Sequence, residues 1–314
     1  MKTIRTMIRP ALCVLFSLGL LTLGLPATAR QLDSPDLIQV FPAGVSPFGL
    51  AFDGTNIWAA SEDSTNVTKL RASDGANLGQ FAVGADTTHA LFDGTYVWFS
   101  SNVSNKVLRL RPSDGTLQGT FAVGGWPLDM AFDGANIWVV NAFDNNVIKL
   151  RASDGELQGT FPVGEYPVGV AFDGANIWVI NSGDNTVTRL QASDGTLLGT
   201  FPAGTSPWSV LFDGANIWIA DFDSDRVRKL RASDGALLGK RHVGFIPEQL
   251  GFDGADVWVT IGGDDTIVRL NATNGVIQKT YALQDASGTV LFDGTSIWVA
   301  GYYSGIVTKI SRDQ

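Results

Sequence analysis

The pattern of apolar and polar positions along the chain predicts short β-strands separated by tight turns. Apolar runs end at turn-forming pairs such as Asp173-Gly174 and Asp194-Gly195. Glycine accepts the positive φ that tight hairpins require, and aspartate hydrogen-bonds its own backbone. One unit predicts four strands, at residues 168–172, 176–181, 186–191 and 197–202. No stretch has sustained helical periodicity, which excludes helical solenoids.

This four-strand unit is repeated along the chain. The tripeptide Phe-Asp-Gly recurs at a constant spacing of 40, beginning at Phe52, Phe92, Phe132, Phe172, Phe212, Phe252 and Phe292. A tryptophan follows each of these phenylalanines, at Trp58, Trp98, Trp138, Trp178, Trp218, Trp258 and Trp298. A period of this length is typical of solenoids and propellers. The run Ile177–Ile180 is apolar on both faces of its strand, which suits a blade covered by a neighbour on each side.

The sequence therefore predicts an all-β, seven-bladed β-propeller of four-stranded antiparallel blades, with the tryptophans wedged between blades. The two ends of the repeat region predict how the ring closes. The region begins with an unpaired strand of the fourth type, at residues 37–42, and ends with a third-type strand at 306–311. We expect the N-terminal strand to form the outer edge of the last blade.

Residues 1–29 have the order of a secretory signal peptide. Lys2, Arg5 and Arg9 precede an apolar run from Ala11 to Leu25, and the small-residue motif Ala27-Thr28-Ala29 follows. The run has about 15 residues, whereas a membrane-spanning helix needs about 20. We therefore expect cleavage after Ala29, a secreted or periplasmic protein without a membrane span, and a single propeller domain at residues 30–314. The alternative is an uncleaved anchor.

Removal of this segment also changes the charge and the cysteine content. The full chain has a formal net charge of −9, and the segment contains three basic and no acidic residues, which leaves −12. So acidic a domain repels phosphate backbones, which disfavours nucleic acid as a partner. The only cysteine, Cys13, lies in the segment, so the mature protein has no disulfide.

The repeats resemble those of the YVTN and NHL-type bacterial β-propellers. The resemblance is clear in residues 167–190, which contain Phe172-Asp-Gly and Ile177-Trp-Val-Ile. The resemblance covers about residues 36–312 and extends to the streptogramin lyases. Resemblance to the streptogramin lyases implies histidine chemistry and a divalent metal at the central mouth of the ring. This chain departs from the pattern, because one of its two histidines, His89, begins an innermost strand and the other, His242, lies on an outermost strand.

Variation between repeats indicates where a site would lie. The loop before each first strand and the loop between the second and third strands should share one face, and these loops vary most. Near the central mouth, Asp129, Asn141, Asn181 and Asp221 provide hard oxygen ligands for Ca²⁺ or Mg²⁺. His89 is the candidate acid or base. The alternative is a water-filled polar funnel without a ligand.

Aromatic residues outside the repeat pattern fall on the same variable face. They are Phe48, Trp126, Tyr166, Trp208, Phe245, Tyr302 and Tyr303. Aromatic surfaces beside carboxylates suit sugars, peptides or cationic ligands. The alternative is that these side chains seal the gaps between blades near the rim.

The sequence has no Gly-rich phosphate loop, no Gly-x-Ser-x-Gly and no His-Glu-x-x-His, which disfavours the common nucleotide-binding and hydrolase chemistries. The leading hypothesis is a monomeric, non-enzymatic binding or scaffold module for a protein, peptide or glycan. Trp126, Trp208, Tyr166, Phe48 and Tyr302 would form its contact surface. The rival hypothesis is a metal-assisted lyase or lactonase, with ligands around Asp129 and Asp221 and with His89 as acid or base.

Overall fold

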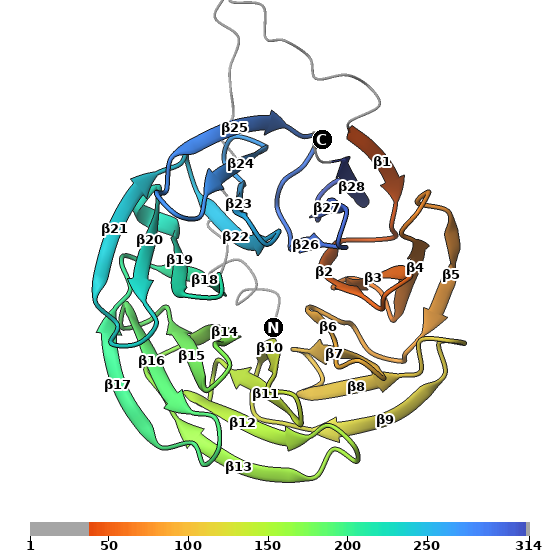
Figure 1. Ribbon diagram of the computed structural model, residues 1–314. Helices are drawn as coiled ribbons and strands as arrows, with labels where there is room; N and C mark the ends of the chain where they lie inside the picture. The colour runs from red at the N-terminus through yellow and green to blue at the C-terminus, as the bar shows by residue number, and fades with distance from the viewer. Residues whose placement is uncertain (1–37, 312–314) are drawn as a thin grey trace, which may run out of the picture. The chain divides into compact units, whose positions relative to one another are not determined.

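A computed structural model describes residues 38–311 of the chain. These residues form 28 strands in seven four-stranded antiparallel sheets, arranged as blades in a ring (Figure 1). The seven-bladed β-propeller predicted from the sequence is confirmed. The predicted signal peptide at residues 1–29 lies outside the described residues. No helical segment in the described part is long and apolar enough to cross a membrane.

The first, innermost strand of each blade ends at the phenylalanine of the Phe-Asp-Gly motif. The first strands of blades 1 to 7 are β2 (Pro47–Phe52), β6 (Ala90–Phe92), β10 (Pro127–Phe132), β14 (Pro167–Phe172), β18 (Pro207–Phe212), β22 (Pro247–Phe252) and β26 (Val290–Phe292). The second strands contain the repeated tryptophan and are β3 (Asn56–Ser61), β7 (Val97–Ser101), β11 (Asn136–Asn141), β15 (Asn176–Asn181), β19 (Asn216–Asp221), β23 (Asp256–Ile261) and β27 (Ser296–Gly301).

The third and fourth strands complete each blade towards the rim. The third strands are β4 (Asn66–Arg71), β8 (Lys106–Leu110), β12 (Asn146–Arg151), β16 (Thr186–Gln191), β20 (Arg226–Arg231), β24 (Thr266–Asn271) and β28 (Ile306–Ser311). The fourth strands are β5 (Asn77–Ala82), β9 (Leu117–Ala122), β13 (Leu157–Pro162), β17 (Leu197–Pro202), β21 (Leu237–His242), β25 (Ile277–Ala282) and, for blade 7, β1 (Ile38–Pro42). One short 3₁₀ helix, η1 (Phe222–Ser224), joins β19 to β20.

The ring closes as predicted, by pairing of strands from opposite ends of the chain. β1 is antiparallel to β28, with Ile38 opposite Ile310 and Pro42 opposite Ile306. The side chain of Phe41 on β1 lies against Gly75, in a turn of blade 1, where a Cβ would come within 2.1 Å of the ring. This glycine is required because a side chain there would occupy the space of the closing phenylalanine.

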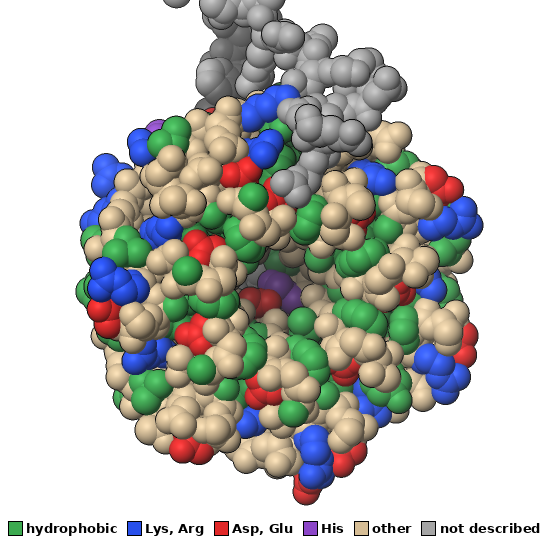
Figure 2. All heavy atoms as spheres, in the orientation of Figure 1, with side chains coloured by type: hydrophobic (Ala, Val, Ile, Leu, Met, Phe, Trp, Pro, Cys, Tyr) green, Lys and Arg blue, Asp and Glu red, His purple; other side chains and the backbone are tan. Residues whose placement is uncertain are grey.

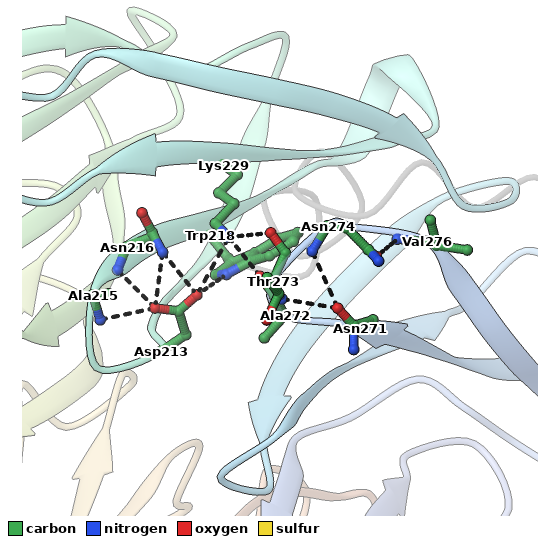
Figure 3. A network of polar contacts seen from close by, with 10 residues as sticks. All are labelled: Asp213, Ala215, Asn216, Trp218, Lys229, Asn271, Ala272, Thr273, Asn274 and Val276. Atoms are coloured by element: carbon green, nitrogen blue, oxygen red, sulfur yellow. Dashed lines mark hydrogen bonds and ion pairs between the residues drawn. The ribbon is translucent and has the colours of Figure 1, made fainter.

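The aspartate of each Phe-Asp-Gly motif has a partner that the sequence did not reveal. In blade 5, Asp213 Oδ1 accepts hydrogen bonds from the backbone N atoms of Ala215 and Asn216, which form the turn (Figure 3). Its Oδ2 accepts a hydrogen bond from Trp218 Nε1 at 2.7 Å. All seven blades have this aspartate–tryptophan bond. The buried indole N–H is thereby satisfied, and the tryptophan is fixed between blades as expected.

In six of the seven blades, a basic residue on the third strand connects the blade to its neighbour. Lys229 lies over the ring of Trp218, 5.1 Å from its centroid, and donates through Nζ to the backbone O atom of Thr273 in blade 6 at 3.3 Å (Figure 3). The same contact runs from Lys149 to the backbone O of Ala192 at 2.7 Å. Each tryptophan therefore has an aspartate at its edge and a cation over its face, and in six blades the cation reaches across to the next blade.

Candidate functional site

Two kinds of loop form the variable face of the propeller, which we term the loop face: the loops that precede the first strands and those between the second and third strands. The Phe-Asp-Gly and Ser-Asp-Gly turns form the opposite face, the turn face. On the loop face, Asn105 Oδ1 accepts a hydrogen bond from Trp126 N at 3.0 Å, and Asn145 Oδ1 accepts one from Tyr166 N at 2.9 Å. Each bond joins loops of adjacent blades, so this face is held in one arrangement.

Trp126 and Tyr166 have left-handed backbone conformations, with φ of 58° and 50°. Such φ values cost roughly 1–2 kcal/mol in residues other than glycine. Each residue precedes the proline that begins a first strand, and each is held by the asparagine bond across the blade boundary. The same position has a positive φ in three other blades, at Ser46, Ser206 and Ile246, so this backbone conformation belongs to the repeat.

Three aromatic side chains lie side by side on the loop face of blades 3 and 4, and we term them the aromatic row. The rings of Trp126 and Phe143 are stacked, with centroids 5.0 Å apart and 23° between their planes. Phe143 and Tyr166 follow at 6.3 Å and 40°. Phe143 is 50% exposed, while Trp126 and Tyr166 are half-buried against the core of these blades. Burial raises the pKa of Tyr166 to about 12, so its phenol is neutral.

Phe143 was not predicted from the sequence. Its position in the loop between second and third strands is occupied by Asp63, Val103, Gly183, Asp223, Gly263 and Tyr303 in the other repeats. A comparison of these loops position by position would have identified Phe143 as an aromatic residue outside the pattern.

The other predicted aromatic contacts lie apart from the row. Trp208 is half-buried on β18, and its ring centroid is 6.0 Å from that of Phe222. Phe48 on β2 is only 2% exposed, and its ring meets those of His89 and Tyr302 edge-on. Burial of Phe48 fits the alternative interpretation, in which an aromatic residue seals the space between blades.

Figure 2 shows a histidine beside an acidic side chain in the central opening of the ring. His89 directly precedes β6, the innermost strand of blade 2, whereas the other histidine of the chain, His242, belongs to the outer strand β21. The backbone of His89 exchanges hydrogen bonds with Ser100, and the Phe48 ring centroid is 5.1 Å from that of the imidazole. Gly49 permits this position, because a Cβ there would lie 2.4 Å from the Cα of His89.

Asp129 lies on β10 in the irregular part of its pairing with β11, and it joins two blades. Its Oδ1 accepts a hydrogen bond from Met130 N at 2.8 Å, and its Oδ2 accepts one from Val170 N of blade 4 at 3.0 Å. Burial raises the pKa of Asp129 to about 6, although both hydrogen bonds favour the charged form. Both carboxylate oxygens are therefore engaged by backbone N–H groups.

The other three predicted metal ligands are fully buried within their own blades. Asn141 Nδ2 donates to Asn146 Oδ1, and Asn181 Nδ2 donates to Thr186 Oγ1. Asp221 forms a salt bridge of 2.8 Å with Arg228 Nε and accepts a hydrogen bond from Thr205 N. Among residues 38–311 there is no group of three or more His, Cys, Asp or Glu side chains arranged to hold a metal ion. A shared Ca²⁺ or Mg²⁺ site at these residues stays a prediction from the sequence.

No protein-family model and no curated protein matches the chain. Among solved structures, the chain is similar to a streptogramin B lyase, with 19% identity and a TM-score of 0.74, over 88% of this chain and 97% of that one. It is also similar to a chain of the Kuenenia stuttgartiensis hydrazine synthase, with 15% identity and a TM-score of 0.75, over 92% of this chain and 99% of that one. At these identities the similarity shows the propeller fold, and membership of the YVTN or NHL group remains a prediction.

Proposed function

We propose that this propeller is a non-enzymatic binding module that presents its loop face to a protein, peptide or glycan outside the cytoplasm. The observation that carries the proposal is the aromatic row. Phe143 exposes half of its surface to solvent while stacked on Trp126. Aromatic side chains that are exposed yet held rigidly supply much of the binding energy in protein interfaces. The extracellular location rests on the signal-peptide pattern of residues 1–29.

The seven repeated tryptophans provide a contrast within the same molecule. Trp138 and Trp178 are fully buried, and each has an aspartate partner for its indole N–H. Phe143 and Trp126 interrupt the repeat pattern, and Tyr303 of blade 7 is the other aromatic residue at the repeat position of Phe143. Packing of the blades explains the repeated tryptophans, and ligand contact explains an exposed aromatic residue such as Phe143, which departs from the repeat.

The test is a selection of ligands on the purified protein, with a random-peptide display library and a glycan array as probes. Phe143→Ala and Trp126→Ala should abolish binding of the selected ligands. The matched control is Leu197→Ala, which removes an equally exposed apolar side chain (60%) from the outer strand β17. Selected ligands that bind Phe143→Ala as well as they bind the wild type would contradict the proposal, as would a selection that yields no ligand.

One observation favours the second candidate, a lyase or lactonase, namely the histidine beside an acidic side chain in the central opening of the ring (Figure 2). A histidine is the side chain best suited to acid–base chemistry near neutral pH. This candidate predicts turnover that His89→Ala abolishes and His242→Ala does not affect. The contacts of Asp129 and Asp221 described above give no shared metal site, so we derive no step through a metal ion. An activity that survives His89→Ala would eliminate this candidate.

A further inference from the structure

The loops of the loop face carry charge of one sign, and the exposed cations nearest to them are Lys106 and Arg226, which begin the third strands β8 and β20. The fourteen loops of this face contain eleven acidic residues and no lysine or arginine. The acidic residues are Glu62, Asp63, Asp86, Asp144, Glu165, Asp184, Asp223, Asp225, Asp264, Asp265 and Asp285. A face with this composition attracts cationic partners and repels anionic ones over distances set by the salt concentration.

On the turn face, by contrast, the carboxylates are largely neutralised. Asp74 pairs with Arg71 at 3.0 Å, Asp114 pairs with Arg111 at 3.0 Å, and Asp234 pairs with Arg231 at 2.9 Å. Two aspartates of the Phe-Asp-Gly turns also lie 4.0 Å from a lysine, Asp133 from Lys149 and Asp213 from Lys229. The asymmetry between the two faces is therefore larger than the residue types alone suggest.

Three of the loop-face carboxylates flank the aromatic row. Asp144 follows Phe143 in the chain, and its Oδ2 accepts a hydrogen bond from Gly125 N, next to Trp126, at 2.7 Å. Glu165 precedes Tyr166, and Glu165 N donates to Asp184 Oδ2 at 3.0 Å. All three side chains are exposed, and within residues 38–311 none of the three forms an ion pair. Aromatic faces and exposed carboxylates without an ion pair among the described residues thus occupy the same surface.

The row and its carboxylates are held by the backbone. Ala142 N donates to Trp126 O, and Phe143 N donates to Gly125 O, both at 3.1 Å. In the next blade, Gly183 N donates to Glu165 O at 2.9 Å. These bonds tie the two loops of each blade together, so a ligand would meet a surface that needs little ordering, which reduces the entropic cost of binding.

We propose that the ligand of the loop face is a cationic polypeptide segment, whose lysine or arginine side chains lie over the aromatic row and pair with Asp144, Glu165 and Asp184. This inference rests on the proposed binding function and specifies the chemistry of the partner. Cations bind favourably over aromatic faces, and the neighbouring carboxylates add charge-assisted hydrogen bonds.

The arrangement of the rings favours an extended ligand over a single small cation. A small quaternary ammonium ion is bound best by an aromatic cage that surrounds it. Here the rings follow one another in a row, with 23° and 40° between successive planes, and the row runs from blade 3 to blade 4. A polypeptide can place successive basic side chains along such a row.

The experiment measures fluorescence anisotropy of three labelled peptides with one sequence, in which the variable positions are Lys and Arg, their neutral analogues acetyl-lysine and citrulline, or Glu. We expect the cationic peptide to bind at least about tenfold more tightly than the neutral one, a difference of about 1.4 kcal/mol. Its affinity should fall as salt is added. Phe143→Ala and Glu165→Gln should each weaken binding severalfold.

The matched control is Glu156→Gln, which removes the same charge from an exposed carboxylate of the turn face. If Glu156→Gln weakens binding as much as Glu165→Gln, the peptide responds to net charge alone and the inference is overturned. If the neutral peptide binds as tightly as the cationic one and still requires Phe143, the cationic specificity is overturned but the binding function stands. If no peptide binds in a manner that depends on Phe143, both proposals lose their support.

Discussion

Arg269 on β24 forms a salt bridge with Asp256 on β23, with 2.6 Å between Nη2 and Oδ2. The equivalent cations of other blades donate to backbone O atoms in a turn of the next blade, as Arg109 does to Ala152. Among residues 38–311, blade 7 has no such turn, because its fourth strand, β1, comes from the other end of the chain. Four other blades have asparagine at the repeat position of Asp256. The Asp256 carboxylate supplies Arg269 with the hydrogen-bond acceptor that a turn of the next blade supplies elsewhere.

We therefore predict that Asp256→Asn lowers the free energy of unfolding by roughly 1.5–3 kcal/mol, as expected for a hydrogen bond to a charged group. Urea denaturation checks this, with the exposed aspartate of the Arg231–Asp234 pair as control, since Asp234→Asn should change stability little. In a double-mutant cycle with Arg269→Gln, the two substitutions should be strongly non-additive. Additive effects would contradict the pairing.

The raised pKa of Asp129 predicts an unusual pH dependence of the free energy of unfolding. Its folded pKa of about 6 exceeds the ordinary value of 3.8, so the folded state binds the proton more tightly than the unfolded state does. The contribution of Asp129 to the free energy of unfolding is fully present below about pH 4 and is lost as the pH rises through about 6. This loss lowers the free energy of unfolding by roughly 3 kcal/mol.

The measurement is the free energy of unfolding of the wild type and of Asp129→Asn between pH 4 and pH 7. The difference between the two curves isolates this group from the other carboxylates. The wild type should lose stability relative to the variant as the pH rises. Parallel curves would show that Asp129 has an ordinary pKa.

The left-handed backbone at Trp126 predicts that the glycine variant is more stable than the alanine variant, which is the reverse of the usual order. Trp126→Gly should be more stable than Trp126→Ala by about 1 kcal/mol, because glycine adopts positive φ without strain. At Glu156, which has no positive φ, alanine should be more stable than glycine. Thermal denaturation of the four variants measures both differences. The same order at both positions would show that Trp126 is not strained.

The sequence predicted the ring, the strands and the closure because each blade repeats the same pattern. Strands at 176–181, 186–191 and 197–202 lie at the residues expected from Asp173-Gly174 and Asp194-Gly195. The aspartate–tryptophan bond was not predicted, because Asp173 satisfies its own turn and nothing in the sequence shows that Oδ2 also reaches Trp178 Nε1.

The candidate site was predicted less completely, because it consists of departures from the repeat. The loop face and Trp126 were identified, but Phe143 was not, since contact between Phe143 and Trp126 depends on how two loops of one blade meet. Of the oxygen ligands expected at the mouth, the carboxylates of Asp129 and Asp221 have other partners in the structure, whereas Oδ1 of Asn141 and Oδ1 of Asn181 are buried without a hydrogen-bond partner among the described residues. Asp221 binds Arg228, and this pairing follows from a cross-strand register that the spacing of residues does not reveal.

The measurement that tests the central claim most directly is hydroxyl-radical footprinting of the protein with and without the cationic peptide. Aromatic side chains are readily oxidised, so each member of the aromatic row reports its own exposure. We predict that the peptide protects Trp126, Phe143 and Tyr166, while Tyr96 at the turn face is oxidised equally in both samples. Protection confined to other residues, or none at all, would contradict a polypeptide-binding site on the loop face of blades 3 and 4.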